Sequence, residues 1–204
     1  MKKGERSKQH LIECAAELFW QRGYNATGVS EILEKAGLPK GSFYYYFGSK
    51  RELASAVIDY YSRTLCASMR KLADGADWET FSDRVFDFVN ELEEVMGHVG
   101  CPFAAVGMEM AFPEPDLARE YFAALEESRR LFTEVLLASG LDSAQAEELS
   151  KLLFSVYEGR LLIYRISGDR AQAEELRKEM KDVFLMWMDR YAENAAGHDK
   201  ERSI

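Results

Sequence analysis

The chain lacks the features of a secreted, disulfide-bonded or membrane-spanning protein. Only three of its 204 residues are cysteine, an odd number whose wide spacing matches no disulfide framework. No apolar run approaches the roughly 20 residues that a membrane-spanning helix needs, and the N-terminus has no apolar signal-peptide segment. We therefore expect a cytoplasmic protein with no membrane partner.

The side chains that catalytic and metal sites use most often are scarce as well. The three histidines, His10, His98 and His198, form no nucleophile–base pair and no metal-ligand spacing. His98 and Cys101 together supply only half of a zinc motif. The sequence therefore favours neither an enzyme nor a protein that holds a metal ion or a cofactor.

Proline and alternating runs of β-branched residues are also few, which favours an all-α chain. Four prolines occur in the whole sequence, while 47% of the residues are hydrophobic, enough to build a core. Apolar residues recur at steps of three and four, as in amphipathic helices. Beyond the first fifty residues this pattern predicts helices over residues 50–74, 78–98, 102–111, about 115–139, 143–167 and 171–195.

The most informative stretch of the chain runs from Thr27 to Glu52. Its first apolar positions predict a short helix with the stripe Val29, Ile32, Leu33 and Ala36. We expect Thr27 to cap this helix through its hydroxyl and Gly37 to end it. A helical pattern over residues 11–22, closed by Gly23, precedes the stretch.

A second helix after Pro39 has an unusual outward face. Phe43 and Phe47, four residues apart, are expected to face inward. The other sides then carry Lys40, Ser42, Tyr44 and Tyr45, with Tyr46 flanking the phenylalanines. Three consecutive tyrosines cannot all lie on one helix face, so at least one must point outward. Such a face suits the phosphates and base edges of DNA; the alternative is that the tyrosines are ordinary core aromatics.

A charged helix start follows the tyrosines. Ser49 and Glu52 have the spacing of a capping box, and Lys50 and Arg51 lie in the first turn that it opens. The free N–H groups and the partial positive charge of that turn would add to theirs and hold a backbone phosphate. The first fifty residues therefore predict three helices around a small core, arranged as a helix-turn-helix.

The charge distribution supports a DNA-facing end. The whole chain has 26 Lys and Arg against 35 Asp and Glu, but residues 1–51 have a net charge of +4 and the remainder −13. A basic end on an acidic body is the electrostatic pattern of a protein that docks on DNA through one surface. Part of the positive charge forms a short arm before the first predicted helix, with Lys2, Lys3, Arg6 and Lys8.

The run G-Y-x-x-T-G-V, followed by A-G-x-x-K-G-S-F-Y-Y-Y-F-x-S-K, resembles the N-terminal region of TetR-family transcriptional repressors. The resemblance covers residues 11–53 and implies a helix-turn-helix domain at 1–50 and a helical effector-binding and dimerisation domain at 51–204. It also implies DNA contacts by Thr27, Gly28, Lys40, Gly41, Ser42, Tyr44, Tyr45, Tyr46 and Lys50. Among these, Lys40, Gly41, Ser42 and Tyr45 would lie nearest base edges, while Tyr44, Tyr46 and Lys50 mainly hold phosphates. Gly28 and Pro39 depart from the family pattern, which has Ser or Thr at both positions.

The last two predicted helices have broad apolar stripes that suit either a core or a subunit interface. The resemblance favours pairing through this region as a four-helix bundle. The candidate interface residues are Leu152, Val156, Gly159, Ile163, Phe184, Trp187 and Tyr191. A homodimer would place two recognition helices on the half-sites of a palindromic operator in double-stranded DNA.

The middle helices are where we expect a small, mostly apolar effector. The candidate pocket residues are Phe86, Cys101, Phe103, Met108, Glu109, Phe112, Phe122, Tyr157 and Arg160. Each aromatic among them can equally serve as core. Glu109, Glu158 and Arg160 stand in apolar surroundings, where a buried carboxylate–guanidinium pair is the alternative to ligand binding.

Cys101 follows Gly100 and precedes Pro102, so its thiol is expected at the start of a helix, where the dipole favours thiolate. His98 could add positive charge. The Gly-Cys pair followed by an apolar helix also resembles a branch of the family in which some members sense oxidants or electrophiles. The alternative is an inert buried thiol.

The predicted function is a DNA-binding transcriptional regulator. The simplest form is a repressor that leaves its operator when an effector binds or when Cys101 is modified; activation stays an alternative. A helical protein-interaction scaffold would explain the acidic body but not the basic, tyrosine-rich N-terminal end.

Overall fold

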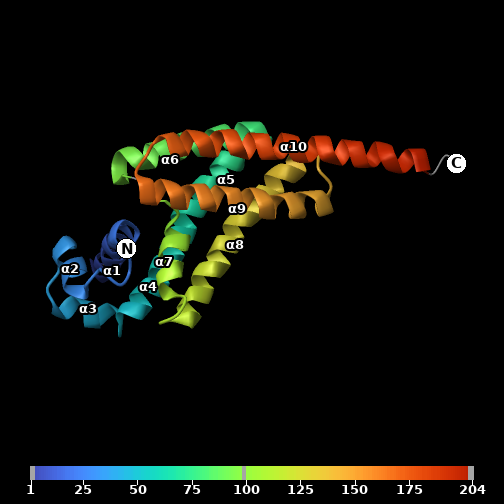
Figure 1. The fold of residues 1–204 in the computed structure, drawn as a ribbon. Helices are drawn as coiled ribbons and strands as arrows, with labels where there is room; N and C mark the ends of the chain where they lie inside the picture. Colours follow the sequence, from blue (N-terminus) through green and yellow to red (C-terminus); the bar gives the residue numbers. More distant parts are fainter. Residues whose placement is uncertain (1–2, 98–99, 202–204) are drawn as a thin grey trace. The chain divides into compact units, whose positions relative to one another are not determined.

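The computed structural model describes residues 3–97 and 100–201, with side chains from Gly4 to Tyr191 within those ranges. In this part of the chain every regular element is helical, as predicted from the sequence. The elements in Figure 1 are α1 (Lys3–Arg22), α2 (Val29–Lys35), α3 (Gly41–Tyr46), α4 (Lys50–Tyr61), the π-helix η1 (Ser62–Cys66), α5 (Ala67–Ala73), α6 (Trp78–Met96), α7 (Pro102–Met110), α8 (Pro115–Ala138), α9 (Ser143–Ser167) and α10 (Ala171–Glu201). No helix among these is long and apolar enough to cross a membrane.

Three of the predicted helices differ from the observed ones, and one of these, α10, runs to Glu201 rather than ending near residue 195. α1 begins at Lys3 rather than near Leu11, because residues 3–10 are rich in good helix formers. Arg6 and Lys8 therefore lie on a helix and not on a flexible arm, while Lys2 lies outside the described residues. The helix predicted over 50–74 contains the π-helical turn η1, in which the Thr64 hydroxyl donates a hydrogen bond to the Tyr60 carbonyl at 2.8 Å.

The chain forms two compact units. The first comprises residues 1–70 and 96–128, and the second comprises residues 71–95 and 129–204. α4 and α7 therefore belong to the same compact unit as the N-terminal helices. Tyr61, at the end of α4, shows why: its hydroxyl donates to the Ala16 carbonyl at 2.5 Å, and its ring meets the edge of Phe103 on α7. The functional boundary predicted between residues 50 and 51 remains a prediction.

The core of the first unit is built from the inward faces of α1, α4 and α7. Its fully buried side chains include Leu11, Phe19, Phe43, Leu53, Val57, Tyr61 and Val106. The Trp20 indole on α1 donates to the Gly100 carbonyl at 2.8 Å, just before α7. Gly107 lets α7 approach α8, since a Cβ there would lie 3.3 Å from the Tyr121 Cβ. α7 is thus held against the N-terminal helices and against α8.

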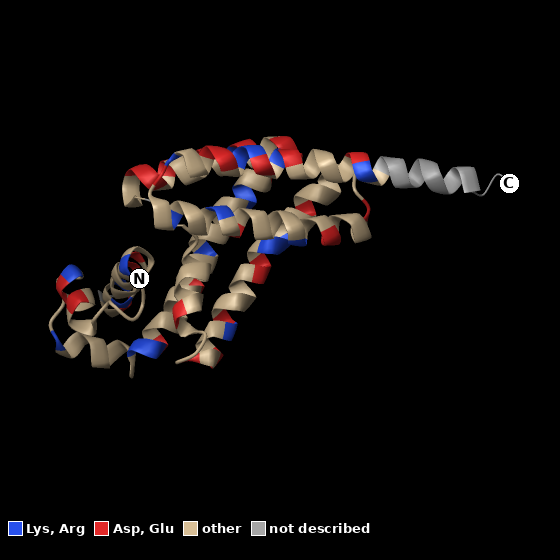
Figure 2. Cartoon of the chain, in the orientation of Figure 1, with Lys and Arg blue, Asp and Glu red and all other residues tan. Residues whose placement is uncertain are grey.

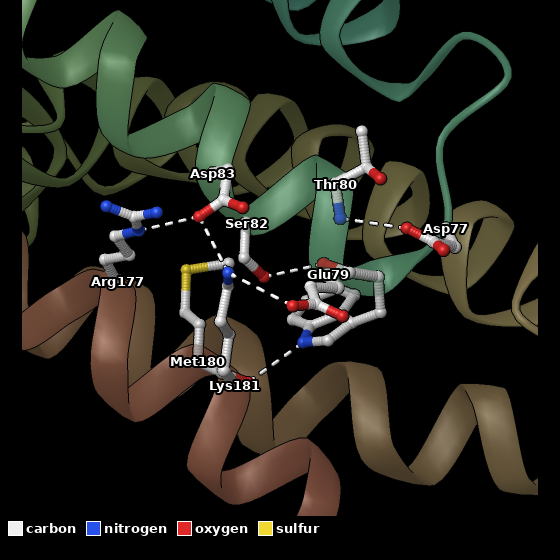
Figure 3. Close-up of polar contacts among 9 residues, drawn as sticks. Asp77, Glu79, Thr80, Ser82, Asp83, Arg177, Met180 and Lys181 are labelled. Carbon is white, nitrogen blue, oxygen red and sulfur yellow. Dashed lines mark hydrogen bonds and ion pairs between the residues drawn. The ribbon is translucent and has the colours of Figure 1, made fainter.

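The core of the second unit is an aromatic cluster of Trp78, Phe81, Phe132 and Phe154, all buried. Polar contacts fasten α6 to α10 around it (Figure 3). The Trp78 indole donates to the Met180 carbonyl at 2.9 Å. Asp83 accepts from both Arg177 and Lys181, which keeps the pKa of this carboxyl below its usual range; the hydrogen bond from Lys181 is the main cause.

Candidate nucleic-acid interface

The short helix α3 presents its tyrosines to solvent. Phe43 and Phe47 are buried, whereas Tyr44 and Tyr45 are 76% and 81% exposed, and Tyr46 is half-buried. The two inward rings lie 6.1 Å apart and fix the rotation of the helix. The prediction of inward phenylalanines and outward tyrosines is confirmed, and core aromatics are excluded for Tyr44 and Tyr45. Two neighbouring large rings left in solvent on one short helix suit contact with a partner.

The turn before α3 is open and polar. Lys40 is exposed at the N-cap of α3, without a side-chain capping bond. Gly41 is also exposed, and apart from its chain neighbours and the backbone of α3 no atom of the described residues lies within 4 Å of where its Cβ would be. Ser42 is half-buried. Gly28, another predicted DNA contact, is exposed and caps α2 without a side chain. A phosphate or base edge could approach the backbone at both glycines.

Thr27 has a different role from the predicted cap. It is fully buried, and its hydroxyl donates to the Gly23 carbonyl at 2.7 Å. The N-cap of α2 is Gly28, so the capping prediction for Thr27 is wrong. The hydroxyl points back into the loop because the end of α1 leaves carbonyls without helical partners. Thr27 therefore supports the predicted DNA-binding residues from within and offers its side chain to no external partner.

Lys50, at the start of α4, is held inside the unit. Its ammonium donates to the Tyr24 carbonyl at 2.5 Å and lies 4.1 Å from the centre of the Tyr24 ring. Burial lowers the pKa of Lys50, and the negative charge of Glu109 opposes this effect. The ammonium thus has a fixed place beside the N-terminus of α4.

The cap of α4 matches its prediction in part. The Ser49 hydroxyl accepts from the Glu52 N–H at 3.1 Å, as a capping box requires. The Glu52 carboxylate accepts from the Gly48 N–H at 2.8 Å, one residue before the expected donor. The first turn of α4 keeps further N–H groups free for an anion, with Arg51 nearby in an ion pair with Glu114.

The loop between α1 and α2 contains functional groups that the sequence pattern did not reveal. The Asn25 N–H donates to the Glu109 carboxylate on α7 at 2.7 Å. Gly23 has a φ of +90°, and a Cβ at this position would overlap the same carboxylate. The Glu109 carboxylate therefore occupies a space that is open only because residue 23 is a glycine. No local signal could have found this contact, since the partners are 84 residues apart.

The predicted effector residues of the first unit are divided between core and surface. Phe103 is buried against Tyr61, and the Glu109 carboxylate accepts a hydrogen bond from the Asn25 N–H. Cys101 is half-buried at the N-cap of α7, as predicted, while His98 lies outside the described residues. The remaining three are largely exposed: Met108 at 57%, Phe112 at 95% and Phe122 at 60%.

The predicted effector residues of the second unit are partly used in packing. The Tyr157 ring packs on Phe132. Arg160 pairs with the Glu179 carboxylate and also donates to Gln172, so the carboxylate–guanidinium alternative holds for Arg160, with a partner on α10. The hydrogen bond to Glu179 raises the pKa of Arg160. Phe86 lines a depression of about 370 Å³ with Glu174, Arg177, Lys178 and Lys181. Those charged neighbours suit a mostly apolar effector poorly.

The candidate interface residues form a partly exposed apolar surface on α9 and α10. Leu152, Ile163 and Tyr191 are 48%, 45% and 44% exposed, whereas Val156, Phe184 and Trp187 are half-buried. Apart from its chain neighbours and the adjacent backbone of α9, no atom of the described residues lies within 4 Å of a Cβ placed on Gly159. The stripe of α10 changes along its length, since Leu176 and Met180 are buried core while Leu185 and Met186 are exposed.

Figure 2 shows how charge is distributed on the chain. Acidic residues are frequent along α6, α8, α9 and α10, where basic residues are interspersed, and α3 carries no acidic residue. In the described part of the chain, His, Cys, Asp and Glu side chains form no cluster that could hold a metal ion. Because α3 carries no acidic residue, its exposed face can approach a polyanion without repulsion from a carboxylate of its own helix.

Two family models match the chain in consecutive segments. Residues 11–57 match the bacterial regulatory proteins of the tetR family, and residues 79–172 match the C-terminal domain of LmrA/YxaF-like transcriptional regulators. Among curated proteins, an uncharacterized HTH-type transcriptional regulator of Mycobacterium tuberculosis is 27% identical, over 87% of this chain and 94% of the relative. The HTH-type transcriptional regulator LmrA of Bacillus subtilis is 26% identical, over 77% and 85%.

Solved structures show the same fold. A TetR transcriptional regulator from Legionella pneumophila superposes with a TM-score of 0.77 at 21% identity, covering 86% of this chain and 95% of that one. The reduced form of NemR from Escherichia coli superposes with a TM-score of 0.73 at 21% identity, covering 87% and 96%. The helix-turn-helix geometry, the two matched domains and these folds agree. The chain belongs to the TetR family of transcriptional regulators, and its C-terminal domain is LmrA/YxaF-like.

Proposed function

We propose that the protein is a homodimeric repressor that binds a palindromic operator and is released by a small effector or by modification of Cys101. The observation that supports DNA reading best is the exposure of Tyr44 and Tyr45 on α3, a helix that two buried phenylalanines hold in place. Lys40, Gly41, Ser42 and Tyr45 would then lie nearest base edges, with Tyr44, Tyr46 and Lys50 at the phosphates and the backbone of Gly28 close to the DNA. Repression rather than activation is supported by NemR, a relative described as an HTH-type transcriptional repressor.

Dimer formation follows from the demands of recognition. A helix of six residues makes few base contacts, so one copy would bind its half-site weakly. Two copies joined by a two-fold axis hold both recognition helices at a fixed separation and multiply these contacts. The apolar surface of α9 and α10 is our proposed interface, in a family whose C-terminal domains bind ligands and dimerise. Operation on DNA also places the protein in the cytoplasm.

The proposed function is tested by binding to the DNA upstream of the protein's own gene. We expect a gel shift with this fragment and a steep loss of affinity as salt rises, each lysine–phosphate contact adding about −0.9 to the log–log slope. A random duplex of equal length should bind more weakly at every salt concentration. Equal binding to both duplexes would contradict sequence recognition, and absence of binding at low salt would favour the scaffold alternative.

The second part of the proposal concerns Cys101. Its thiol is half-buried at the N-cap of α7, whereas Cys14 and Cys66 are buried, and burial raises the pKa of both of their thiols. We propose that the Cys101 thiolate adds to electrophiles and that α7 then shifts. The reduced form in which NemR was solved is compatible with such thiol chemistry in this family.

Alkylation with N-ethylmaleimide should therefore modify Cys101 before the other two cysteines, as measured by peptide mass spectrometry. The same reagent should release the operator fragment from the wild-type protein but not from the Cys101→Ser variant. Wild type and variant should bind equally well before treatment. An equal response of both proteins to the reagent would leave Cys101 as an inert thiol and assign release to another group or to a non-covalent effector.

A further inference from the structure

The loop between α1 and α2 joins α7 to the predicted phosphate-binding lysine. Several polar groups of this loop have partners within the first unit. The Gly23 carbonyl accepts from the Thr27 hydroxyl, and the Tyr24 carbonyl accepts from both the Thr27 N–H at 3.3 Å and the Lys50 ammonium. The Asn25 N–H reaches outside the N-terminal helices, to the Glu109 carboxylate on α7.

The position of Glu109 is specific. It lies one residue before the end of α7, is half-buried, and directs its carboxylate at the loop. The missing side chain of Gly23 leaves the space for this carboxylate. A charged acceptor on a backbone N–H makes a stronger hydrogen bond than a neutral one, so the contact fixes the loop in one place.

We propose that Glu109 is a positioning residue for DNA contact: its carboxylate holds the Tyr24–Asn25 turn, and the turn holds the ammonium of Lys50 beside the first turn of α4. The proposal rests on the proposed DNA binding by Lys50. The proposal gives Glu109 no direct contact with DNA and assigns its carboxylate to the turn instead of to an effector. Its negative charge also favours the charged form of Lys50, which burial opposes.

The consequence is a lower entropic cost of binding a phosphate, because the Lys50 side chain is ordered in advance. A lysine that is already placed needs little further ordering when a phosphate arrives, whereas a free lysine must be immobilised at binding. Loss of the Glu109 contact would release the turn and, with it, the Tyr24 carbonyl that holds Lys50. The effect would be the same for every DNA sequence, because phosphate contacts do not read bases.

The test compares Glu109→Ala, which removes the acceptor, with Glu109→Gln, which keeps an acceptor oxygen but not the charge. Glu127→Gln is the matched control, since Glu127 belongs to the same unit and its replacement removes the same charge, but it pairs with Arg70 on α5 rather than with the loop or with the first turn of α4. Two measurements are made on the full chain: hydrogen exchange of the Asn25 amide by NMR, and affinity for a random DNA duplex at low salt. The random duplex removes any need for the operator sequence.

We expect the Asn25 amide to be protected in the wild type, less so in Glu109→Gln and exposed in Glu109→Ala. Affinity for the random duplex should fall in the same order, by about threefold and about tenfold, while Glu127→Gln matches the wild type. If the Asn25 amide exchanges at the wild-type rate in Glu109→Ala, the contact between Glu109 and the Asn25 N–H is contradicted. If this amide exchanges faster but affinity for the random duplex is unchanged, the positioning role of Glu109 is contradicted. If Glu109→Ala does not fold, Glu109→Gln decides both points. A wild type that binds the random duplex but discriminates against no sequence would contradict the proposed function and leave this inference standing.

Discussion

Replacing Tyr45 by alanine is expected to abolish most operator discrimination without unfolding the protein. Tyr45 is 81% exposed on α3 and is one of the residues that we place nearest base edges. Loss of one base-edge contact costs about 1.4 kcal/mol, or tenfold, and a dimer loses it in both half-sites, about a hundredfold in total. Fluorescence anisotropy with the operator fragment and with a random duplex measures the effect: affinity should fall for the first and change little for the second.

Tyr44→Ala is the matched comparison for this prediction. Tyr44 is the same residue type on the same short helix and is 76% exposed, but we place it on a phosphate. Its loss should weaken binding to both duplexes by the same factor, since phosphate contacts do not depend on sequence. Both variants should melt at nearly the wild-type temperature, because both side chains are largely in solvent. Identical effects of the two substitutions on discrimination would contradict the assignment of separate roles.

Much of the fold could be predicted because it depends on local patterns. The helix at residues 143–167 was predicted with its exact bounds, since Asp142 and Gln145 form a capping box and Gly168 ends the helix with a φ of +63°. The inward phenylalanines of α3 follow from their four-residue spacing. Such features depend on neighbours within one or two turns, which the sequence displays directly.

The parts of the candidate site that could not be predicted depend on choices between equivalent partners. The Thr27 hydroxyl could either cap α2 or donate back to α1, and sequence spacing does not distinguish the two. Glu158 and Arg160 stand close in sequence, but residues two apart do not face each other on a helix, and Arg160 pairs with Glu179 instead. The contact of Glu109 with Asn25 requires the tertiary fold itself.

The observed contacts change the roles that can be assigned to the charged residues in the middle of the chain. Glu109 and Arg160 were candidates for effector binding, yet both have protein partners that account for their burial. The exposed apolar side chains that remain from the same prediction, Met108, Phe112 and Phe122, all belong to the first unit. An effector search is therefore better directed at ligands that cover these three than at ligands with a charged anchor.

The prediction with the largest effect on assembly is Ile163→Glu. Ile163 is 45% exposed on α9, so glutamate is tolerated in the isolated chain, where water can reach it. In the proposed dimer the two-fold axis would bury two such carboxylates without partners, at a cost of several kcal/mol. We expect a monomer at micromolar concentration in light scattering and a loss of operator affinity of at least about a hundredfold, because one half-site is then bound alone.

Leu137→Glu separates this effect from a general effect of surface charge. Leu137 is 43% exposed on α8, so the same substitution there changes charge and apolar area to a similar degree, outside the proposed α9 and α10 interface. This variant should remain dimeric and bind the operator as the wild type does. A dimeric Ile163→Glu protein with normal affinity would remove Ile163 from the interface. If both variants were monomeric, the interface would extend to α8, and the four-helix arrangement of α9 and α10 from two copies would have to be replaced.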